Sequence, residues 1–101
     1  MARPIIFLPE ALAEAREAYI WYEEKEIGLG EDFYRALSVA LTYAARNPET
    51  PRAVYMNYRR VLLRRFPYAV FYRHDADVIH IFSVFHCSQN PEKWRKRLKK
   101  S

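Results

Sequence analysis

The spacing of apolar positions divides the chain into a helical front half and a strand-forming back half. Over residues 9–46 apolar side chains recur at three- and four-residue intervals, which is the period of an amphipathic helix. From Arg59 onward the period shortens to two, in segments rich in Val, Ile, Phe and Tyr. This order predicts an α+β fold in which an N-terminal helical hairpin packs on one face of a small, mostly antiparallel sheet.

Proline and glycine mark the ends of the two predicted helices. Pro9 suits a first helical position because its φ is already fixed, and residues 3–8 before it fit a short first strand. Gly28 stands where a left-handed cap would end the first helix, at about Glu26. The second helix should stop before Asn47 because a residue preceding proline avoids the α region. We therefore expect a helical hairpin over residues 9–46.

Each predicted helix carries an apolar stripe. In the first helix we expect it at Leu8, Leu12, Ala15, Tyr19 and Tyr22, with Glu10, Glu14, Glu17, Glu24 and Lys25 on the solvent side. In the second helix we expect it at Phe33, Leu37, Ala40, Leu41 and Ala44.

Three strands and a last short helix follow. Strands are predicted over residues 59–66, 68–74 and 77–86, and the polar turn at residues 74–77 makes the last two antiparallel neighbours in a β-meander over residues 59–86. Asn90, Pro91 and Glu92 provide a cap, a first-position proline and a first-turn acid for a short C-terminal helix in the basic segment 91–101. We expect one domain over residues 1–101.

Both faces of the last strand are largely apolar. Simple alternation places Val78, His80, Phe82, Val84 and His86 on one face, and Ile79, Ile81, Ser83 and Phe85 on the other. The helical hairpin can cover only one face of the sheet, so the pattern predicts a partner chain on the other. The alternative is that the C-terminal helix and the loop at residues 47–58 fold over that face and complete the core.

The charge is unevenly distributed. Residues 1–32 hold eight acidic and three basic side chains, whereas residues 33–101 hold fourteen basic and four acidic ones, and the net charge is +5. A basic field of this size favours nucleic acid, a nucleic-acid enzyme or an acidic regulatory protein as a partner. The chain has one cysteine, Cys87, has no apolar run of membrane-spanning length, and lacks signal-peptide features in its first residues. We expect a cytoplasmic protein that does not contact a membrane.

Several ordered motifs resemble the RelE/ParE superfamily of toxins from bacterial type II toxin–antitoxin pairs. The back half contributes Arg65-Phe66-Pro67-Tyr68, Ile81-Phe82-Ser83-Val84-Phe85-His86, Asn90-Pro91-Glu92-Lys93-Trp94 and Arg97. The front half contributes Ala11, Ala15, Tyr19, Tyr22, Gly28, Leu29, Gly30, Phe33 and Leu37. The set covers nearly the whole chain, and this order of motifs is hard to produce by chance.

The resemblance implies a cognate antitoxin whose C-terminal segment wraps the toxin. On the second sheet face, such an amphipathic segment would fold on binding and cover exposed aromatic side chains. The antitoxin-binding residues expected in this case are Tyr68, Val70, Tyr72, His80, Phe82 and Val84.

The superfamily implies two targets, because RelE-like members cleave messenger RNA in the ribosome and ParE-like members poison DNA gyrase. Metal-free RNA cleavage needs a group that accepts the 2′-hydroxyl proton and a group that protonates the leaving oxygen. No lysine lies between Lys25 and Lys93, and the last tyrosine is Tyr72. His86 is the remaining acid–base candidate, with Arg64 and Arg65 as cations, although a strand-end histidine can also simply hydrogen-bond the following loop. These departures favour the ParE-like branch, in which the toxin binds without performing chemistry, and leave RNA cleavage as the alternative.

For gyrase poisoning we expect the target-binding surface to be basic. Its candidate residues are Arg60, Arg64, Arg65, Lys93, Trp94, Arg95 and Arg97. Direct nucleic-acid binding by the basic tail is a further possibility, with Trp94 stacking on a base. A third class is a non-toxic family member that serves only as a structural partner in an antitoxin repressor complex.

No metal site, cofactor or small-molecule substrate is expected. His80 and His86 stand six residues apart on one strand, about 20 Å, which is too far for one metal ion to bridge, and His74 does not complete a site. Cys87 and His86 are neighbours on a strand and should point to opposite faces. Gly28-Leu29-Gly30 is too short for a phosphate-binding loop and does not follow a predicted strand.

Overall fold

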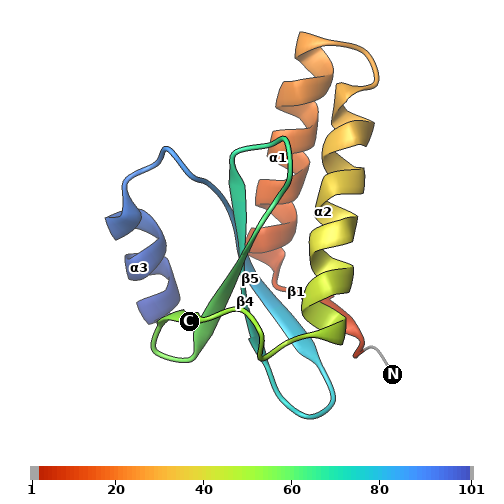
Figure 1. The fold of residues 1–101 in the computed structure, drawn as a ribbon. Helices are drawn as coiled ribbons and strands as arrows, with labels where there is room; N and C mark the ends of the chain where they lie inside the picture. The colour runs from red at the N-terminus through yellow and green to blue at the C-terminus, as the bar shows by residue number, and fades with distance from the viewer. Residues whose placement is uncertain (1–2, 101) are drawn as a thin grey trace.

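The computed structural model of the protein describes residues 3–100, and the ends of the expected domain at residues 1, 2 and 101 lie outside it. The described residues form three helices and a twisted sheet of five strands, whose arrangement can be followed in Figure 1. In chain order the elements are β1 (Ile5–Phe7), α1 (Pro9–Lys25), α2 (Leu29–Arg46), β2 (Ala53–Tyr55), β3 (Tyr58–Leu62), β4 (Tyr68–His74), β5 (Ile79–His86) and α3 (Pro91–Lys100).

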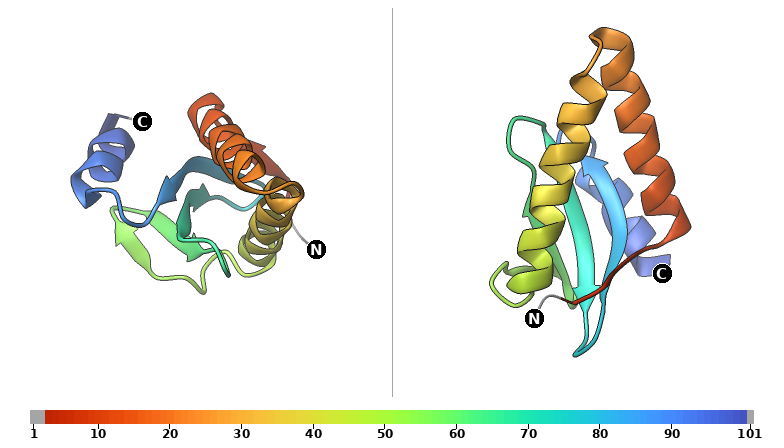
Figure 2. Two further views of the ribbon diagram at one scale, coloured as in Figure 1. Left: turned by 90° about the horizontal axis from the view of Figure 1, so that it is seen from above. Right: turned by 90° about the vertical axis from the view of Figure 1, so that its right-hand side faces the viewer.

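The sheet has the strand order β1-β5-β4-β3-β2. Only the pair β1–β5 is parallel, with Ile5 opposite Ile79 and Phe7 opposite Ile81. The other pairs are antiparallel. Seen from above in Figure 2, α1 and α2 lie on one side of the sheet and α3 on the other. The predicted α+β fold with a helical hairpin and a short C-terminal helix is therefore confirmed, with one strand, β2, that the sequence pattern did not predict.

The reversal between α1 and α2 depends on two glycines. Gly28 has a φ of 92°, which only glycine adopts without strain, as the predicted left-handed cap requires. The Glu23 carboxylate accepts hydrogen bonds from the backbone N–H groups of Gly28 and Gly30. At Gly30 a Cβ atom would lie 2.9 Å from the Tyr19 carbonyl oxygen, so only glycine allows the two helices to approach so closely. The reversal is thus fixed by backbone geometry and one carboxylate.

The hairpin packs on the sheet through a stripe that differs in α1 from the predicted one. The buried residues of α1 are Ala11, Ala15 and Ala18, whereas Leu12 is 40% exposed. Alanine side chains let α1 approach α2 and β5 more closely than leucine side chains would. Helix α1 therefore turns its alanines, and not Leu12, toward the core. In α2 the predicted stripe is confirmed at Phe33, Leu37, Ala40 and Ala44, with Leu41 partly buried.

A β-bulge in β5 changes which residues share a face. Phe71 pairs with Ser83 but Tyr72 pairs with Ile81, so Phe82 is an extra residue in the ladder. The predicted simple alternation along β5 is therefore wrong. Ile79, Ile81 and Val84 pack in the core beneath the hairpin, whereas Phe82 and Phe85 belong to the core on the opposite face.

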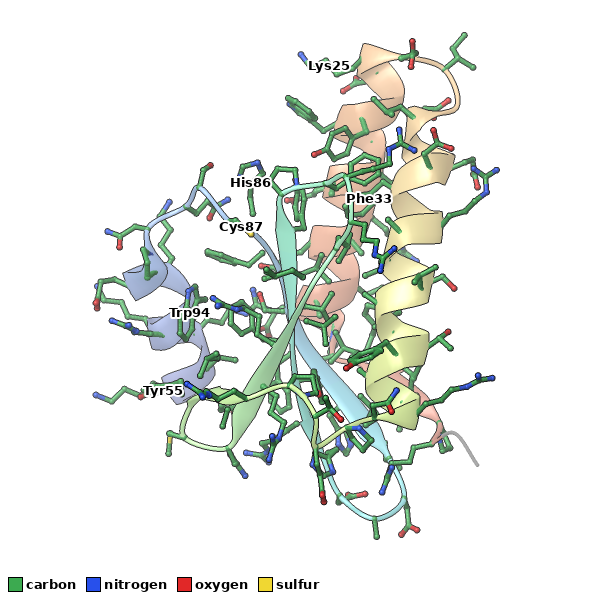
Figure 3. All side chains as sticks on the ribbon, in the orientation of Figure 1. Lys25, Phe33, Tyr55, His86, Cys87 and Trp94 are labelled. Atoms are coloured by element: carbon green, nitrogen blue, oxygen red, sulfur yellow. The ribbon has the colours of Figure 1, made fainter. Side chains whose placement is uncertain are left out.

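The opposite sheet face is covered by the chain itself. Its second core consists of Tyr58, Ala69, Phe71, Phe82, Phe85, Trp94 and Leu98, with Leu8, Val54 and Tyr55 at its margin. Trp94 of α3 stacks on Phe71 with 4.7 Å between ring centroids. It also meets Tyr55 edge-on (Figure 3). The prediction of a sheet face left open for a partner is wrong, because α3 and the β2–β3 hairpin close it. The alternative reading of the sequence describes this arrangement.

The buried phenol of Tyr72 should make the stability of the folded protein fall at alkaline pH. Its side chain is fully buried, its hydroxyl donates to the Pro48 carbonyl oxygen at 2.9 Å, and burial raises the pKa of the phenol from 10.0 to about 12. Between pH 10 and 12 the unfolded chain loses this proton first, so stability falls as pH rises, by about 2–3 kcal/mol for this group. Urea unfolding at a series of pH values should show that Tyr72→Phe is less stable by about 1 kcal/mol at pH 7 and has a shallower alkaline decline. Identical slopes for the two proteins above pH 10 would contradict this assignment.

Candidate functional site

The six residues expected to bind an antitoxin do not form one surface. Val70, Tyr72 and Val84 are buried in the core beneath the helical hairpin, and Tyr68 packs against that core from its margin. Phe82 lies in the second core, beneath α3. His80 is half-buried. The predicted common face is wrong because α3 covers one side of the sheet and the bulge moves Val84 to the other.

The basic residues expected to bind a target also separate into groups. Arg64 and Arg65 lie in the turn after β3 and line a cavity against α2, whereas Arg60 lines a different cavity with Trp94 of α3. Lys93 and Arg95 are exposed on α3. Trp94 is only 8% exposed, and the Arg97 side chain turns inward, so neither belongs to an outer basic face.

Arg97 and Glu14 join α3 to α1 across the edge of the sheet. The Arg97 guanidinium donates to a Glu14 carboxylate oxygen and to the Phe82 carbonyl oxygen, and Glu10 adds an outer ion pair at 3.3 Å. The other Glu14 oxygen accepts from the Val84 N–H at 2.9 Å and from the Ser83 hydroxyl at 3.1 Å. The helical period had assigned Glu14 to solvent, and no feature of the sequence indicated this cluster.

The location of the Glu14–Arg97 pair explains its contacts. Strand β1 ends at Phe7, and the Leu8 N–H makes the last backbone contact with β5, to the Ile81 carbonyl oxygen at 3.0 Å. Beyond that point β5 has no neighbouring strand on this side. The Glu14 carboxylate and the Arg97 guanidinium therefore hydrogen-bond the Val84 N–H and the Phe82 carbonyl oxygen, as a neighbouring strand would. A buried backbone group without such a partner costs free energy.

His86 ends β5 and is bound to the loop that follows. Its Nδ1 accepts a hydrogen bond from the Ser88 N–H at 3.1 Å and lies 2.7 Å from the Ser88 hydroxyl, and its ring meets Tyr68 edge-on. This is the structural role that sequence reasoning had kept as the alternative. It leaves Nε2 as the nitrogen that carries the proton of the neutral ring.

The three nuclease candidates are not brought together. His86 lines a cavity of about 60 Å³ with Arg60, Cys87 and Trp94, and a second one of about 690 Å³ beside α1. Neither is lined by Arg64 or Arg65, and the cavity that those arginines line does not include His86. Residues 3–100 contain no group of three His, Cys, Asp or Glu side chains that could hold a metal ion. In the same part of the chain, no helix is long and apolar enough to cross a bilayer.

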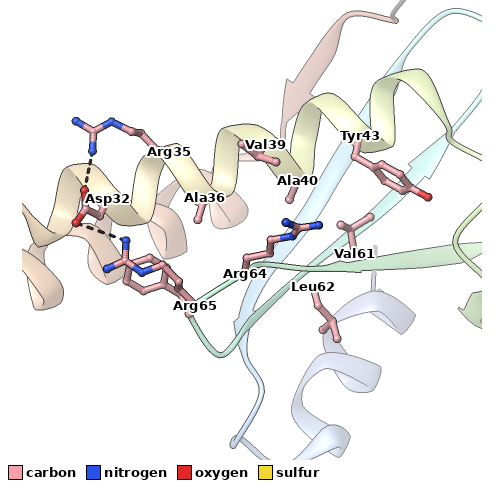
Figure 4. Close-up of a pocket in the computed structure, with 11 residues that line it drawn as sticks. Asp32, Arg35, Ala36, Val39, Ala40, Tyr43, Val61, Leu62, Arg64 and Arg65 are labelled. Atoms are coloured by element: carbon pink, nitrogen blue, oxygen red, sulfur yellow. Dashed lines mark hydrogen bonds and ion pairs between the residues drawn. The ribbon is translucent and has the colours of Figure 1, made fainter.

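A groove of about 610 Å³ runs between α2 and β3, and is called the α2–β3 groove below (Figure 4). Its lining residues are Asp32, Arg35, Ala36, Val39, Ala40, Tyr43, Val61, Leu62, Arg64, Arg65 and Phe66. Asp32 pairs with Arg35 at 2.6 Å and with Arg65 at 3.7 Å. The groove therefore combines an apolar floor with an arginine-rich rim.

A helical hairpin on a small sheet, closed by a basic helix and bordered by an arginine-rimmed groove, defines a small basic domain that presents binding surfaces on a rigid frame. The family model for the ParE toxin of the type II toxin–antitoxin system parDE matches residues 5–91, and the chain belongs to this family. The resemblance seen in the sequence is thereby confirmed. A comparison with curated protein sequences finds no match.

Solved structures with the same fold come from both branches of the superfamily. The chromosomal ParDE toxin–antitoxin system from P. aeruginosa matches with a TM-score of 0.66 and 15% identity, over 84% of this chain and 96% of that one. The E. coli toxin RelE, as a mutant with two arginines replaced by alanine and in the free state, matches with a TM-score of 0.73 and 22% identity, over 99% of this chain and 98% of that one. At these identities the likeness establishes the fold.

Proposed function

We propose that this chain is the toxin of a type II pair that acts in the cytoplasm, inhibits DNA gyrase by binding, and is neutralised by a cognate antitoxin. The observation that carries the proposal is the lining of the two cavities at His86. The smaller one, beneath α3, is about 60 Å³, which is too little for a nucleotide. The larger one, about 690 Å³, is lined by Glu14 and Glu17 and by no lysine or arginine, so it repels a phosphate and has no cation to stabilise one.

The chemistry of the nearby groups also favours binding over RNA cleavage. The cations on this part of the sheet are arginines, which stabilise phosphate charge but hold their protons too tightly to act as bases. One nitrogen of His86 is already used by the Ser88 N–H. A ribosome-dependent nuclease, the alternative, would have to combine His86 with Tyr68 or a carboxylate such as Glu17, which line the same cavity, for its two proton transfers.

The target-binding surface is best placed on the exposed basic residues of α3 and the neighbouring strand. Lys93, Arg95, Lys96 and Lys99 project from α3 into solvent, and Arg60 is exposed on β3. Trp94 and Arg97 support this surface from below, because they hold α3 on the sheet. Such a surface fits an acidic protein surface or a DNA backbone, both of which a gyrase–DNA complex presents.

The decisive experiment incubates the purified chain with gyrase, ATP and supercoiled plasmid, and measures linear DNA released by detergent and protease. Linear DNA should accumulate, and should disappear when antitoxin is added. His86→Ala should retain most of the yield, because binding requires no proton transfer. Lys93→Glu with Arg95→Glu should lower the yield about tenfold, whereas Arg16→Glu on the exposed side of α1 should leave it unchanged.

Other outcomes would redirect the assignment. An inactive but folded His86→Ala protein would contradict inhibition by binding alone and point to RNA cleavage, for which losses of about 10² or more are expected on removing an acid–base catalyst. Normal growth after induction of the unaltered chain without antitoxin would support the non-toxic structural partner instead.

A further inference from the structure

The larger of the two cavities at His86 is lined by aromatic rings and carboxylates. It has a volume of about 690 Å³ and lies between α1 and the paired ends of β4 and β5, where Tyr68 is opposite His86. This volume is within the range of small-molecule sites. The cavity is called the α1–β5 cavity below, and its aromatic and acidic lining residues include Glu14, Glu17, Trp21, Tyr22, Tyr68 and His86.

Four rings follow one another along the wall of this cavity, each steeply inclined to the next. Trp21 meets Tyr22 at 88° with 5.0 Å between ring centroids. Tyr22 meets Tyr68 at 64° and 6.1 Å, and Tyr68 meets His86 at 78° and 5.0 Å. Rings at such angles turn their faces to different sides of a shared space. Sets of aromatic rings arranged in this way bind ammonium ions, because the face of each ring carries partial negative charge.

The charge of the cavity is opposite to that of the whole chain. Two carboxylates and no lysine or arginine line it, although the net charge of the chain is +5. Glu14 is bound to Arg97, whereas Glu17 is exposed and makes no ion pair within residues 3–100. A cation in the cavity would therefore have the Glu17 carboxylate as a partner that no described side chain already binds.

The ring of Trp21 already attracts a cation from the chain itself. The Lys25 ammonium lies 4.7 Å from the centroid of this ring, although Lys25 does not line the cavity. Tryptophan is the side chain whose ring attracts cations best. Because Trp21 is 53% exposed, its ring retains accessible surface for a second ammonium group.

We propose that the α1–β5 cavity binds a small organic ammonium ion, held by the rings of Trp21 and Tyr68 and by the Glu17 carboxylate. The rings attract the charge of the head group and exclude water from its alkyl substituents, and the carboxylate neutralises it. A free amine and a methylated lysine side chain of another protein carry the same head group, and the experiment below distinguishes these two sources.

Other ligands fit this cavity less well. A phosphate or carboxylate would be repelled by Glu14 and Glu17. A neutral aromatic compound could pack on the rings, but it would leave the Glu17 charge without a partner. Residues 3–100 contain no group of three side chains that could hold a metal ion, and aromatic rings do not replace such ligands. An organic cation satisfies both the rings and the carboxylate.

The first test titrates the full chain with choline and follows the indole N–H signal of Trp21 by NMR. The probe for comparison is the uncharged isostere of choline, in which a tert-butyl group replaces the trimethylammonium group. Choline should give a saturable shift, and the isostere should bind at least about tenfold more weakly, because it has the same shape but no charge. Sodium chloride at matched concentrations controls for ionic strength.

The second test uses variants of the lining, with the backbone amide signals of Tyr68 and His86 as the readout. Glu17→Gln should weaken choline binding about fivefold or more, and Trp21→Ala should weaken it at least about tenfold. Glu24→Gln removes the same charge from an exposed position of α1 outside the cavity and should have no effect. Circular dichroism should show that all three variants keep the helical content of the unaltered chain.

A short peptide with one trimethyllysine separates the two sources of the head group. Tighter binding of this peptide than of choline would assign the cavity to a side chain of another protein, and equal or weaker binding would assign it to a free small molecule. Both results retain the ammonium ion as the ligand.

Three results would each overturn the proposal. They are the absence of a saturable shift with both choline and the peptide, equal affinity for choline and its uncharged isostere, and unaltered choline affinity of folded Glu17→Gln and Trp21→Ala proteins. None of these measurements involves gyrase or an antitoxin. A failure to release linear DNA would therefore refute the proposed target without affecting the assignment of this cavity.

Discussion

Replacing Trp94 by alanine is expected to lower the free energy of unfolding by about 3–5 kcal/mol, the range for truncating a large buried aromatic side chain. Trp94 is 8% exposed, stacks on Phe71 and meets Tyr55. Without it, α3 retains Leu98 as its one buried apolar anchor on the sheet. Urea unfolding would give the free energy, and increased ANS fluorescence should report the uncovered face.

The matched control is Trp21→Ala. Trp21 is 53% exposed on α1 and packs edge-on against Tyr22, so its loss should cost no more than about 1 kcal/mol. If instead Trp94→Ala unfolds at the same urea concentration as the unaltered chain but loses gyrase inhibition, Trp94 would be a target contact, as the sequence first indicated.

Replacing Glu14 by alanine is expected to cost about 2–3 kcal/mol, which is large for a helix residue of this charge. The Glu14 carboxylate bonds the Val84 N–H, the Ser83 hydroxyl and the Arg97 guanidinium, and all three lose this partner at once. The value falls below the range for a fully buried ion pair because the two side chains are about one-fifth exposed. Thermal or urea unfolding would measure the change.

Glu17→Ala provides the comparison, since Glu17 is exposed one turn further along α1 and should contribute within about 0.5 kcal/mol. A double-mutant cycle with Arg97→Ala should give a coupling energy of about 1–2 kcal/mol between Glu14 and Arg97. Additive effects would show that the two side chains act on the edge of β5 independently, and would remove the link between α1 and α3.

The elements that the sequence predicted well are those whose signals are local. The ends of both long helices follow from Pro9, Gly28 and the Asn47-Pro48 pair, each of which restricts its own backbone. The α+β order followed from the change of period near Arg59. These signals need no knowledge of how the elements pack.

The predictions that were wrong concern features set by tertiary packing, namely which face of the sheet a side chain occupies and whether it is buried. The extra residue Phe82 moves Val84 to the hairpin side, and a bulge of this kind leaves no mark in an alternating apolar run. Trp94, which covers the second core together with Leu98, was assigned to the target-binding surface, because a ten-residue helix rich in lysine and arginine gives little sign of its buried side.

The candidate sites also divide into features visible in the sequence and features that depend on tertiary packing. The absence of lysine between Lys25 and Lys93 is a property of composition and was visible at once. The α2–β3 groove and the Glu14–Arg97 pair join residues that are distant in sequence, so helical period alone assigned Glu14 to the solvent side and gave no sign of the groove. Predicting either site requires the register between α2, β3 and β5.

The parallel pair β1–β5 has a consequence for the synthesis of the protein in the cell. Ile5–Phe7 are synthesised before both long helices, but their pairing partners, Ile79–Ile81, are synthesised after them. Pairing between such distant segments forms slowly, because a long loop must close first. The nascent chain therefore cannot complete the sheet, or hold α3 on it, until β5 has left the ribosome.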